Sequence, residues 1–288
     1  MWQSISQQLG EWLQRPYPLD EQLSLGGSNR QQCFRVSDGQ QPLFLKLDRA
    51  ERLEQLEAQA NGLRHLARSG HVATPMVIGV ARLANHSLLA LEWLDLKRNG
   101  DDQSWQRFGR QLANQHLSGA QEMYGFDEDN FLGSSLQPNR WHRHWHSFFA
   151  EQRLGWQLEL AAEKGLRFGD IDELVALAAE RLRHHRPKPA LLHGDLWSGN
   201  LAFIGAHAAT FDPAVYYGDR ECDLAMSQLF GSLPDAFYQG YEAEAPLPAD
   251  TDDRLALYQL PYLLHHAHSY GGQHVADCRQ LISHILAF

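Results

Sequence analysis

The chain has 288 residues, of which 43% are hydrophobic and 21% are charged, and 25 lysines and arginines against 35 acidic residues give a net charge of -10. This composition is typical of a globular protein with one large domain or two lobes, and it excludes fibrous repeats and extensive disorder. The acidic balance counts against non-specific binding of nucleic acid, which needs a basic surface.

The cysteines are few and far apart in the sequence, at Cys33, Cys222 and Cys278, and none forms a CxxC pair. They predict a reducing compartment, and they exclude both a disulfide scaffold and a cysteine-based zinc site. The first residues lack a basic segment followed by an apolar core, and about 18 consecutive apolar residues occur nowhere. We therefore expect a cytoplasmic protein that binds neither nucleic acid nor membrane.

The first part of the chain predicts a small lobe rich in strands. In chain order the pattern indicates a short helix and loop over residues 1–20, strands and turns over 24–48, a helix over 49–67 and a hairpin over 76–94. The helix carries one apolar stripe at helical spacing, made of Leu53, Leu56, Ala60, Leu63 and Ala67.

One strand of this lobe carries a lysine. Leu43, Leu45 and Leu47 point to one face of the strand, and Phe44 and Lys46 point to the other. Lys46 is thereby expected in the middle of a strand, on the face opposite the leucines.

The rest of the chain predicts a larger, mainly helical lobe. Helices are expected over Trp105–Leu117, Trp141–Leu160, Ile171–His185 and the C-terminal fifth, a long loop over residues 125–139, and loops with two strands over 191–226. Trp141, Trp145 and Phe149 recur every four residues, which is more typical of a core than of a site. The fold class is therefore α+β, with an N-lobe over residues 1–94 and a C-lobe over 95–288.

The strongest chemical signal is the run His193-Gly194-Asp195, followed by Asn200 and then by Asp212 in a Phe-Asp-Pro sequence. This order and spacing are those of a phosphoryl-transfer site. Asp195 would accept the proton of an attacking hydroxyl, while Asn200 and Asp212 would hold Mg²⁺ against the phosphates of ATP. His193 is interpreted as structural support of the loop rather than as a base.

These motifs resemble those of a known kinase family. HGDxxxxN and DPA are similar to the HRDxxxxN and DFG elements of protein kinases, and the HGD form is similar to aminoglycoside and choline kinases. Together, LLHGDLWSGN, DPA, YYGDRECDLAM and EWL resemble the fructosamine-3-kinase (ketosamine-3-kinase) family. The resemblance extends over nearly the whole chain, including the segments QPNRW at 137–141 and FFAEQR at 148–153.

The resemblance implies a protein-kinase-like fold of two lobes, with ATP and Mg²⁺ as cofactors. The acceptor would be a ketosamine such as a fructosamine or ribulosamine, free or protein-bound, phosphorylated at its 3-hydroxyl in a deglycation reaction. Lys46 would contact the α- and β-phosphates, and a turn of three small residues would cover them, namely Gly26, Gly27 and Ser28.

Further residues are assigned on the same basis. The backbone of Glu92, Trp93 and Leu94 would face adenine at the hinge between the lobes. Trp197, two residues after the expected base, would either stack on the acceptor or serve only to pack its loop, and the sequence leaves both open. Asp219 and Asp223 are interpreted as structural support that ties the catalytic loop down.

The helical partner of Lys46 stays open between Glu57 and Gln59. Both flank the apolar stripe of their helix by about 80°, on opposite sides. The family pattern places a glutamate at position 59, where this chain has an amide that cannot form an ion pair.

Three other functions compete with the ketosamine kinase. One is an aminoglycoside, choline or sugar kinase of the same fold, and the second, motivated by Gln59, is a nucleotide-binding regulatory protein that is catalytically impaired. The third is a metal-dependent hydrolase built on His193 and Asp195, which lacks a second ligand group nearby.

Two further sets of residues are given structural interpretations. The four histidines His265, His266, His268 and His274 are interpreted as surface or core residues rather than as a metal cluster, because no carboxylate or cysteine accompanies them. Cys33 is interpreted as a small buried hydrophobe, with redox regulation as the competing hypothesis.

Overall fold

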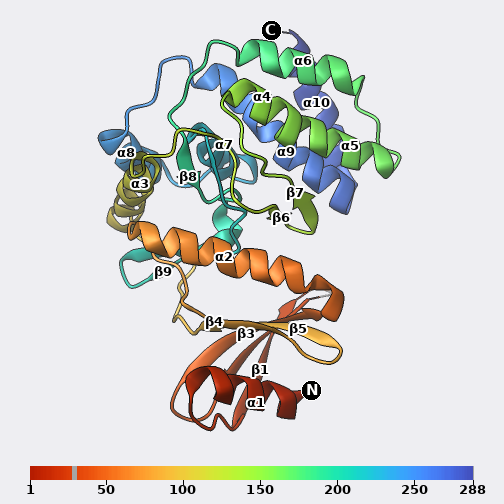
Figure 1. The fold of residues 1–288 in the computed structure, drawn as a ribbon. Helices are drawn as coiled ribbons and strands as arrows, with labels where there is room; N and C mark the ends of the chain where they lie inside the picture. The colour runs from red at the N-terminus through yellow and green to blue at the C-terminus, as the bar shows by residue number, and fades with distance from the viewer. Residues whose placement is uncertain (28–30, 288) are drawn as a thin grey trace.

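Helix α2 (Leu53–Ser69) lies between a strand-rich lobe and a larger helical lobe (Figure 1). This arrangement is seen in a computed structural model that describes residues 1–27 and 31–287. The predicted α+β class with two lobes is confirmed. The division after residue 94 falls between the last strand of the sheet and helix α3 (Asp102–Leu117), and it stays a prediction.

The N-lobe is an antiparallel sheet of five strands in the order β1-β2-β3-β5-β4. Its strands are β1 (Glu21–Gly27), β2 (Gln32–Ser37), β3 (Pro42–Arg49), β4 (Val77–Arg82) and β5 (His86–Glu92). Helix α1 (Trp2–Leu13) covers one face, and α2 covers the other after the short turn η1 (Ala50–Arg52). The predicted order of strands and helices is thus confirmed.

Strand β3 has the two faces expected from its alternation. Leu43, Leu45 and Leu47 are buried under helix α1, while Phe44 packs with the residues of α2. Lys46 lies on the same side as Phe44 and is itself buried, with 4% of its surface exposed. A lysine can be accommodated there because α2 and the C-lobe supply polar partners for its ammonium group.

Helix α2 packs against both lobes. Leu56, Ala60 and Leu63 are buried against the sheet as expected, but Ala67 is exposed and Leu66 is buried instead. Leu66 belongs to the core of the C-lobe, so the last turn of α2 buries a different side from the first turns. A methyl group added at Gly62 would lie 3.0 Å from Cγ of Pro213, which shows how closely the helix approaches the C-lobe.

The described part of the C-lobe consists of helices around three buried clusters, two large and one small, with short strand pairs between them. After α3 its helices are α4 (Trp145–Phe149), the π-helical turn η2 (Ala150–Gly155), α5 (Trp156–Glu163), α6 (Ile171–Arg181), α7 (Glu221–Leu229), α8 (Asp235–Glu244), α9 (Asp252–Tyr270) and α10 (Gln273–Ala287). The strand pairs are β6 (Asn130–Leu132) with β7 (Ser135–Gln137), β8 (Ala190–Leu192) with β11 (Tyr216–Gly218), and β9 (Leu201–Ile204) with β10 (His207–Thr210).

Several elements of this lobe were predicted wrongly. The stretch over 191–226, expected as loops with two strands, carries the four short strands β8 to β11 and the start of α7, and the helix expected to reach His185 ends at Arg181. The expected loop at 125–139 contains the hairpin of β6 and β7, which is held by contacts with distant backbone, from Asn130 to the carbonyl of Val215 and from Gln137 to that of Ala214. The expected helix from Trp141 begins only at Trp145, because residue 142 pairs through its backbone with residue 124. It then runs through a π-helical turn as far as Glu163.

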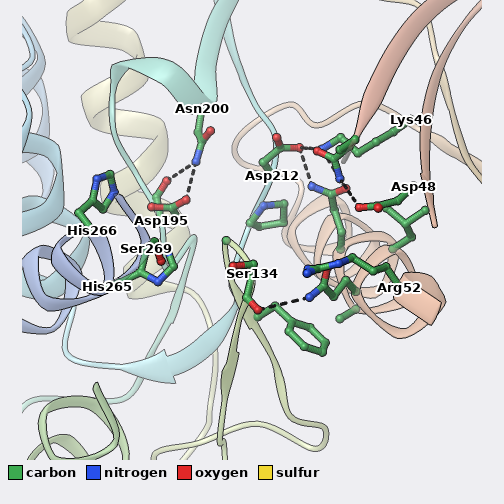
Figure 2. A pocket seen from close by; sticks show the side chains of 18 of the residues that line it. Lys46, Asp48, Arg52, Ser134, Asp195, Asn200, Asp212, His265, His266 and Ser269 are labelled. Atoms are coloured by element: carbon green, nitrogen blue, oxygen red, sulfur yellow. Dashed lines mark hydrogen bonds and ion pairs between the residues drawn. The ribbon is translucent and has the colours of Figure 1, made fainter. Parts of the chain in front are cut away.

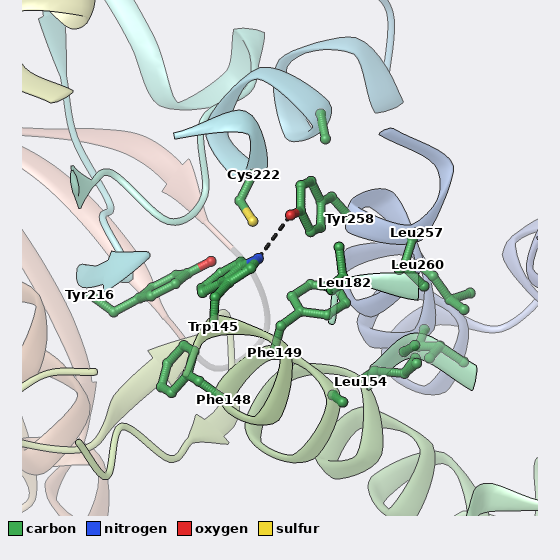
Figure 3. Close-up of a cluster of buried hydrophobic side chains, with 14 of the residues drawn as sticks. Trp145, Phe148, Phe149, Leu154, Leu182, Tyr216, Cys222, Leu257, Tyr258 and Leu260 are labelled. Carbon is green, nitrogen blue, oxygen red and sulfur yellow. Dashed lines mark hydrogen bonds between the residues drawn. The ribbon is translucent and has the colours of Figure 1, made fainter. Parts of the chain in front are cut away.

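The aromatic spacing around Trp145 does mark a core. Trp145 and Phe149 are buried, and the indole of Trp145 donates to the hydroxyl of Tyr258 at 2.8 Å (Figure 3). Trp141 is only half-buried and lies against Tyr217 outside this core, so the prediction is wrong for that residue. Among the described residues no helix has the length and apolar character that a membrane span requires.

Candidate active site

A cleft of about 790 Å³ lies between the lobes and gathers most of the polar residues singled out from the sequence (Figure 2). Its N-lobe wall comes from β3, η1 and α2. Its C-lobe wall comes from the turn between β6 and β7, the segment from Asp195 to Pro213 and the end of α9.

Asp195 and Asn200 are joined directly at this cleft. The Asn200 side-chain amide donates to a carboxylate oxygen of Asp195 at 2.8 Å and to its backbone carbonyl at 2.9 Å. The turn η3 (Ser198–Asn200) between them closes the five-residue spacing that the motif requires. The amide thus fixes the orientation of the Asp195 carboxyl.

The loop that carries Asp195 is tied to the buried carboxylate of Asp223. That carboxylate accepts the backbone N–H groups of His193 at 2.7 Å and Gly194 at 2.9 Å, and the ring of His116 lies at 3.2 Å. Burial alone would raise the pKa of Asp223, but these hydrogen bonds and charges lower it. Gly194 has φ of 80°, and a methyl group there would meet the carbonyl oxygen of Ala214 at 2.0 Å, so glycine is required.

His193 has the structural contacts expected of a loop support. Its Nδ1 accepts the N–H of Asp195 at 3.3 Å, so its Nε2 is the nitrogen that donates to the carbonyl of Phe211 at 3.1 Å. Burial lowers the pKa of this imidazole. Both ring nitrogens are therefore occupied, and the ring is neutral, which does not suit a base.

The carboxyl group of Asp195 is electrostatically unusual. Its pKa is raised to about 7, mainly by burial and in part by the carboxylates of Asp212 and Asp223, while the hydrogen bond from Asn200 opposes the rise. A group whose pKa lies near the working pH can both take up and release a proton, which suits general acid–base chemistry.

Asp212 lies on the same wall of the cleft as Asp195 and pairs with Lys46 of the opposite wall. One oxygen of Asp212 lies 2.7 Å from Nζ of Lys46, and the carboxylate is 44% exposed toward the cleft. The backbone of Asp212 has φ of 55°, a left-handed conformation that aspartate tolerates better than most residues. Lys46, Asp195 and Asp212 thereby lie at one cleft, as the order and spacing of the motifs predicted.

Gln59, and not Glu57, lies beside Lys46. The Gln59 carbonyl oxygen accepts from Nζ of Lys46 at 3.2 Å, and its NH₂ group donates to Asp212 at 2.5 Å. Glu57 is exposed and faces a neighbouring groove instead. An amide can bridge an ammonium and a carboxylate in this way because it is both acceptor and donor, whereas a glutamate would repel Asp212.

We expect Gln59→Leu to lower kcat/KM for ATP about tenfold, because Lys46 loses a hydrogen bond to a charged group. Steady-state kinetics at varied ATP would measure this, with Glu57→Gln as the matched control that stays within about twofold of the wild type. Equal effects of the two substitutions would contradict the assignment of Gln59.

The oxygen donors at the cleft fit Mg²⁺. Asn200 uses its NH₂ group on Asp195, which leaves its carbonyl oxygen for a ligand, and Asp212 uses one oxygen on Lys46 and Gln59. One amide oxygen and one carboxylate are hard ligands of the kind that Mg²⁺ takes from proteins alongside phosphates and water.

The structure gives less evidence for the other residues that were predicted to contact ATP. Gly26 and Gly27 end strand β1 with φ of 94° and 144°, and Ser28 lies outside the described residues. Glu92 ends β5, and its N–H donates to the carbonyl of Met76, while Trp93 and Leu94 directly follow this strand. These roles remain predictions.

Trp197 and three histidines line the C-lobe wall of the cleft, together with Ser269 and Tyr270. Trp197 packs edge-on against Phe230, which lies 4.2 Å from the ring of His266. His265 and His268 are buried, and His266 is half-buried. Figure 2 shows His265 and His266 near Asp195. The histidines were interpreted from the sequence as surface or core residues, and their position at the cleft was missed.

The pKa of His265 is lowered to about 3 and that of His266 and His268 to about 4, mainly by burial and in part by neighbouring histidines and Lys164. The unfolded chain has a pKa near 6.5 at these positions, so it binds more protons than the folded protein below that pH. We therefore expect the unfolding temperature to fall by about 4 °C or more between pH 7 and pH 5, as measured by calorimetry.

A matched pair of variants tests this pH dependence. His268→Gln should remove part of the fall, whereas replacement of the exposed His207 should leave it unchanged. An unfolding temperature that does not vary between pH 7 and pH 5 would contradict neutral buried histidines.

Asp219 supports the fold away from the cleft. Its carboxylate accepts from Tyr258 at 2.7 Å and lies 2.6 Å from the ring of His185. His185, Asp219 and Glu221 lie close enough to hold a metal ion, but Glu221 is already paired with Arg254 at 2.7 Å. These contacts explain the three groups as structural. Among the described residues the hydrogen bonds of Asp219 join it to α9, to His185 and to the N–H of Glu221, so the tie to the catalytic loop expected of both aspartates is seen for Asp223 and not for Asp219.

Cys33 pairs with Lys46 across strands β2 and β3 and is half-buried. Burial raises the pKa of its thiol, although the charge of Lys46 opposes the rise. A raised pKa disfavours the thiolate that oxidation requires, so the structure favours a packing role.

Comparison with known proteins gives one consistent result over the whole chain. A family model described as Fructosamine kinase matches residues 1–288. A protein of Vibrio vulnificus (strain CMCP6) named Probable ketoamine kinase is 42% identical over 288 residues, covering all of both chains. A protein of Escherichia coli (strain K12) with the same description is 43% identical over 287 residues, again covering all of both.

Solved structures agree with this result. A protein of Haemophilus somnus 129PT assigned as a fructosamine-3-kinase superposes with a TM-score of 0.95 and 36% identity, covering 99% of this chain and 98% of that one. A thermostable mutant of the aminoglycoside phosphotransferase APH(4)-Ia, in a ternary complex with ADP and hygromycin B, gives a TM-score of 0.64 at 13% identity, covering 99% of this chain and 98% of that one. At that identity the second likeness concerns the fold alone.

Proposed function

Because the chain belongs to the fructosamine kinase family, we propose that it transfers the γ-phosphoryl group of ATP to the 3-hydroxyl of a ketosamine such as a fructosamine or ribulosamine. Family membership makes the chain an ATP-dependent kinase; the hydroxyl, the base and the acceptor are the proposal. The observation that supports the proposal most is that one cleft is lined by Asp195, Asn200, Asp212 and Lys46.

Asp195 acts as the base. As the acceptor oxygen attacks the γ-phosphorus, its proton passes to the Asp195 carboxylate, and the bond between that phosphorus and the bridging oxygen of ADP breaks. The hydrogen bond from Asn200 holds the carboxylate in place for this transfer. Positioning and charge neutralisation supply most of the catalysis in reactions of this kind.

The nucleotide side of the cleft supplies positive charge. Lys46 is held by Gln59 and Asp212, and it would bind the α- and β-phosphates when ATP is present. Asn200 and Asp212 would hold Mg²⁺, which neutralises charge on the phosphates and on the transferred group. Gly26 and Gly27 would let the backbone approach the phosphates from above.

The acceptor side is suited to a sugar. The ring of Trp197 offers an apolar face for stacking beside Asp195, and His266 lines the same wall with a neutral imidazole and no hydrogen-bond partner among the described residues. Sugars are bound by such combinations of an aromatic face and polar groups. We therefore assign Trp197 and His266 to the acceptor.

We expect His266→Phe to raise the KM for the ketosamine about tenfold, because the ring is kept while one hydrogen bond to the sugar is lost. Initial rates at varied acceptor and saturating ATP would measure the change. His274→Phe is the control, since His274 belongs to the same group of rings but does not line the cleft. An unchanged acceptor KM in His266→Phe would remove His266 from the site.

The experiment that tests the function compares ATP consumption with fructoselysine, ribuloselysine, kanamycin, choline and no acceptor, in the presence of Mg²⁺ and with Asp195→Ala as control. Turnover with ketosamines only, lost in the variant, is the expected result. Turnover with kanamycin or choline would overturn the acceptor class, and ATP binding without any transfer would favour the impaired regulatory protein that Gln59 suggested. A free or protein-bound acceptor, the cytoplasmic location and the absence of nucleic-acid and membrane partners stay predictions.

A further inference from the structure

The acceptor side of the cleft contains a cation that no motif accounts for. Lys164 directly follows helix α5 and lines the cleft together with His268, Ser269 and Tyr270 at the end of α9. Apart from the catalytic segment with Asp195 and Asp212, it is the charged residue that the described C-lobe contributes to the cleft wall.

Two hydrogen bonds hold the ammonium group of Lys164 in place. Its Nζ donates to Nδ1 of His268 and to the backbone carbonyl of the same residue, both at 3.1 Å. Because an ammonium has no lone pair, Nδ1 of His268 is the acceptor, and Nε2 carries the proton that is donated to Gln157 at 2.8 Å. The imidazole is therefore neutral and does not compensate the charge of Lys164.

No negative charge balances Lys164 within the part of the chain that the structure describes. No carboxylate there lies within 4.0 Å of its Nζ, the limit for an ion pair. Its charge is among the causes that lower the pKa of His265 and His268, and no carboxylate acts on either ring in the opposite direction. Lys164, which is exposed, therefore places a positive charge without an ion-pair partner among the described residues at this end of the cleft, on the side that the proposed function gives to the acceptor.

A purely structural role would explain only part of this geometry. Helix α9 ends at Tyr270, and a lysine that donates to the carbonyl of His268 stabilises the negative end of the helix dipole. That role needs a cation near the last turn, but it does not need the cation to line the cleft. It also predicts that substitution of Lys164 lowers the stability of the protein and changes the kinetics equally for every acceptor.

We propose that Lys164 binds an anionic group of the acceptor, the carboxylate of a free amino acid that carries the ketose on its amine. This inference rests on the proposed function and narrows its substrate class. A ketosamine formed on a lysine side chain within a protein has its main-chain carboxyl in a peptide bond and cannot make this contact. Lys164 therefore favours free amino-acid ketosamines over protein-bound ones.

A matched pair of acceptors tests the proposal: fructosylglycine, which carries the carboxylate, and fructosylglycinamide, which does not. We expect the wild-type KM for the acid to be about tenfold lower than for the amide, since a charge-assisted hydrogen bond is lost with the carboxylate. Lys164→Gln should abolish this preference by raising the KM for the acid alone, and Lys164→Arg should restore most of it. Lys188→Gln, at an exposed lysine away from the cleft, is the control.

The outcomes separate this inference from the function on which it rests. Turnover of both acceptors with an acid-to-amide KM ratio that Lys164→Gln does not change would overturn the inference and leave the function standing. A lowered unfolding temperature with equal losses for both acceptors would assign Lys164 to the helix end only. Failure of the wild type to phosphorylate either acceptor would overturn the function and the inference with it.

Discussion

Asp195→Asn is expected to lower kcat about 10³-fold, because an amide cannot take the proton of the attacking hydroxyl. In free energy this is about 4 kcal/mol of lost transition-state stabilisation. The substitution keeps the size of the side chain and an oxygen that can accept from Asn200, so the loop should stay in place. Single-turnover assays with saturating ATP and ketosamine would measure the loss.

Stability and nucleotide binding provide the controls for this variant. Burial disfavours the charged form of Asp195, so removal of its charge should leave the unfolding temperature equal or higher. Binding of ATP, measured by calorimetry, should remain within a few-fold of the wild type. Loss of folding or of ATP binding would show that Asp195 is structural, and retention of kcat would show that another group takes the proton.

Asp212→Asn is expected to lower kcat by a similar factor, about 10³-fold, through the loss of a metal ligand. Asparagine tolerates the left-handed backbone conformation at this position, with φ of 55°, so it is a better test than alanine. The neutral amide also cannot form the ion pair with Lys46. The substitution therefore perturbs both the expected Mg²⁺ site and the lysine that would bind the phosphates.

A titration of MgCl₂ distinguishes this effect from that of Asp195→Asn. The Asp212 variant should need a higher Mg²⁺ concentration for half-maximal activity, whereas Asp195→Asn should not. Asp253→Asn, at an exposed position on helix α9, controls for the general loss of one negative charge. A wild-type kcat in Asp212→Asn at ordinary Mg²⁺ would exclude Asp212 as a ligand.

Local patterns predicted the parts of this molecule whose cause is local. The alternation of leucines with Phe44 and Lys46 correctly identified the two faces of β3, because side chains in a strand alternate irrespective of what covers them. The order and spacing of Asp195, Asn200 and Asp212 predicted that the three would meet, because the connecting turns are short.

Features that depend on distant partners were missed. The apolar stripe of α2 could not show whether Glu57 or Gln59 lies beside Lys46, since both flank it equally. Gln59 is held there by a hydrogen bond to Asp212, which is 153 residues further along the chain. His266 and Lys164 reach the cleft only because α9 and α5 end beside the catalytic segment. The hairpin of β6 and β7 depends likewise on carbonyls near residue 215.

The double attachment of helix α2 has a consequence for how this kinase can be controlled. Its first turns belong to the sheet and its last turn to the core of the C-lobe, with Gly62 close against Pro213. A helix fixed at both ends cannot swing outward to withdraw Gln59 from Lys46 without opening two cores. We therefore expect the catalytic groups to be assembled before substrates arrive, so that flux follows the amount of protein and the supply of ketosamine rather than an on–off signal.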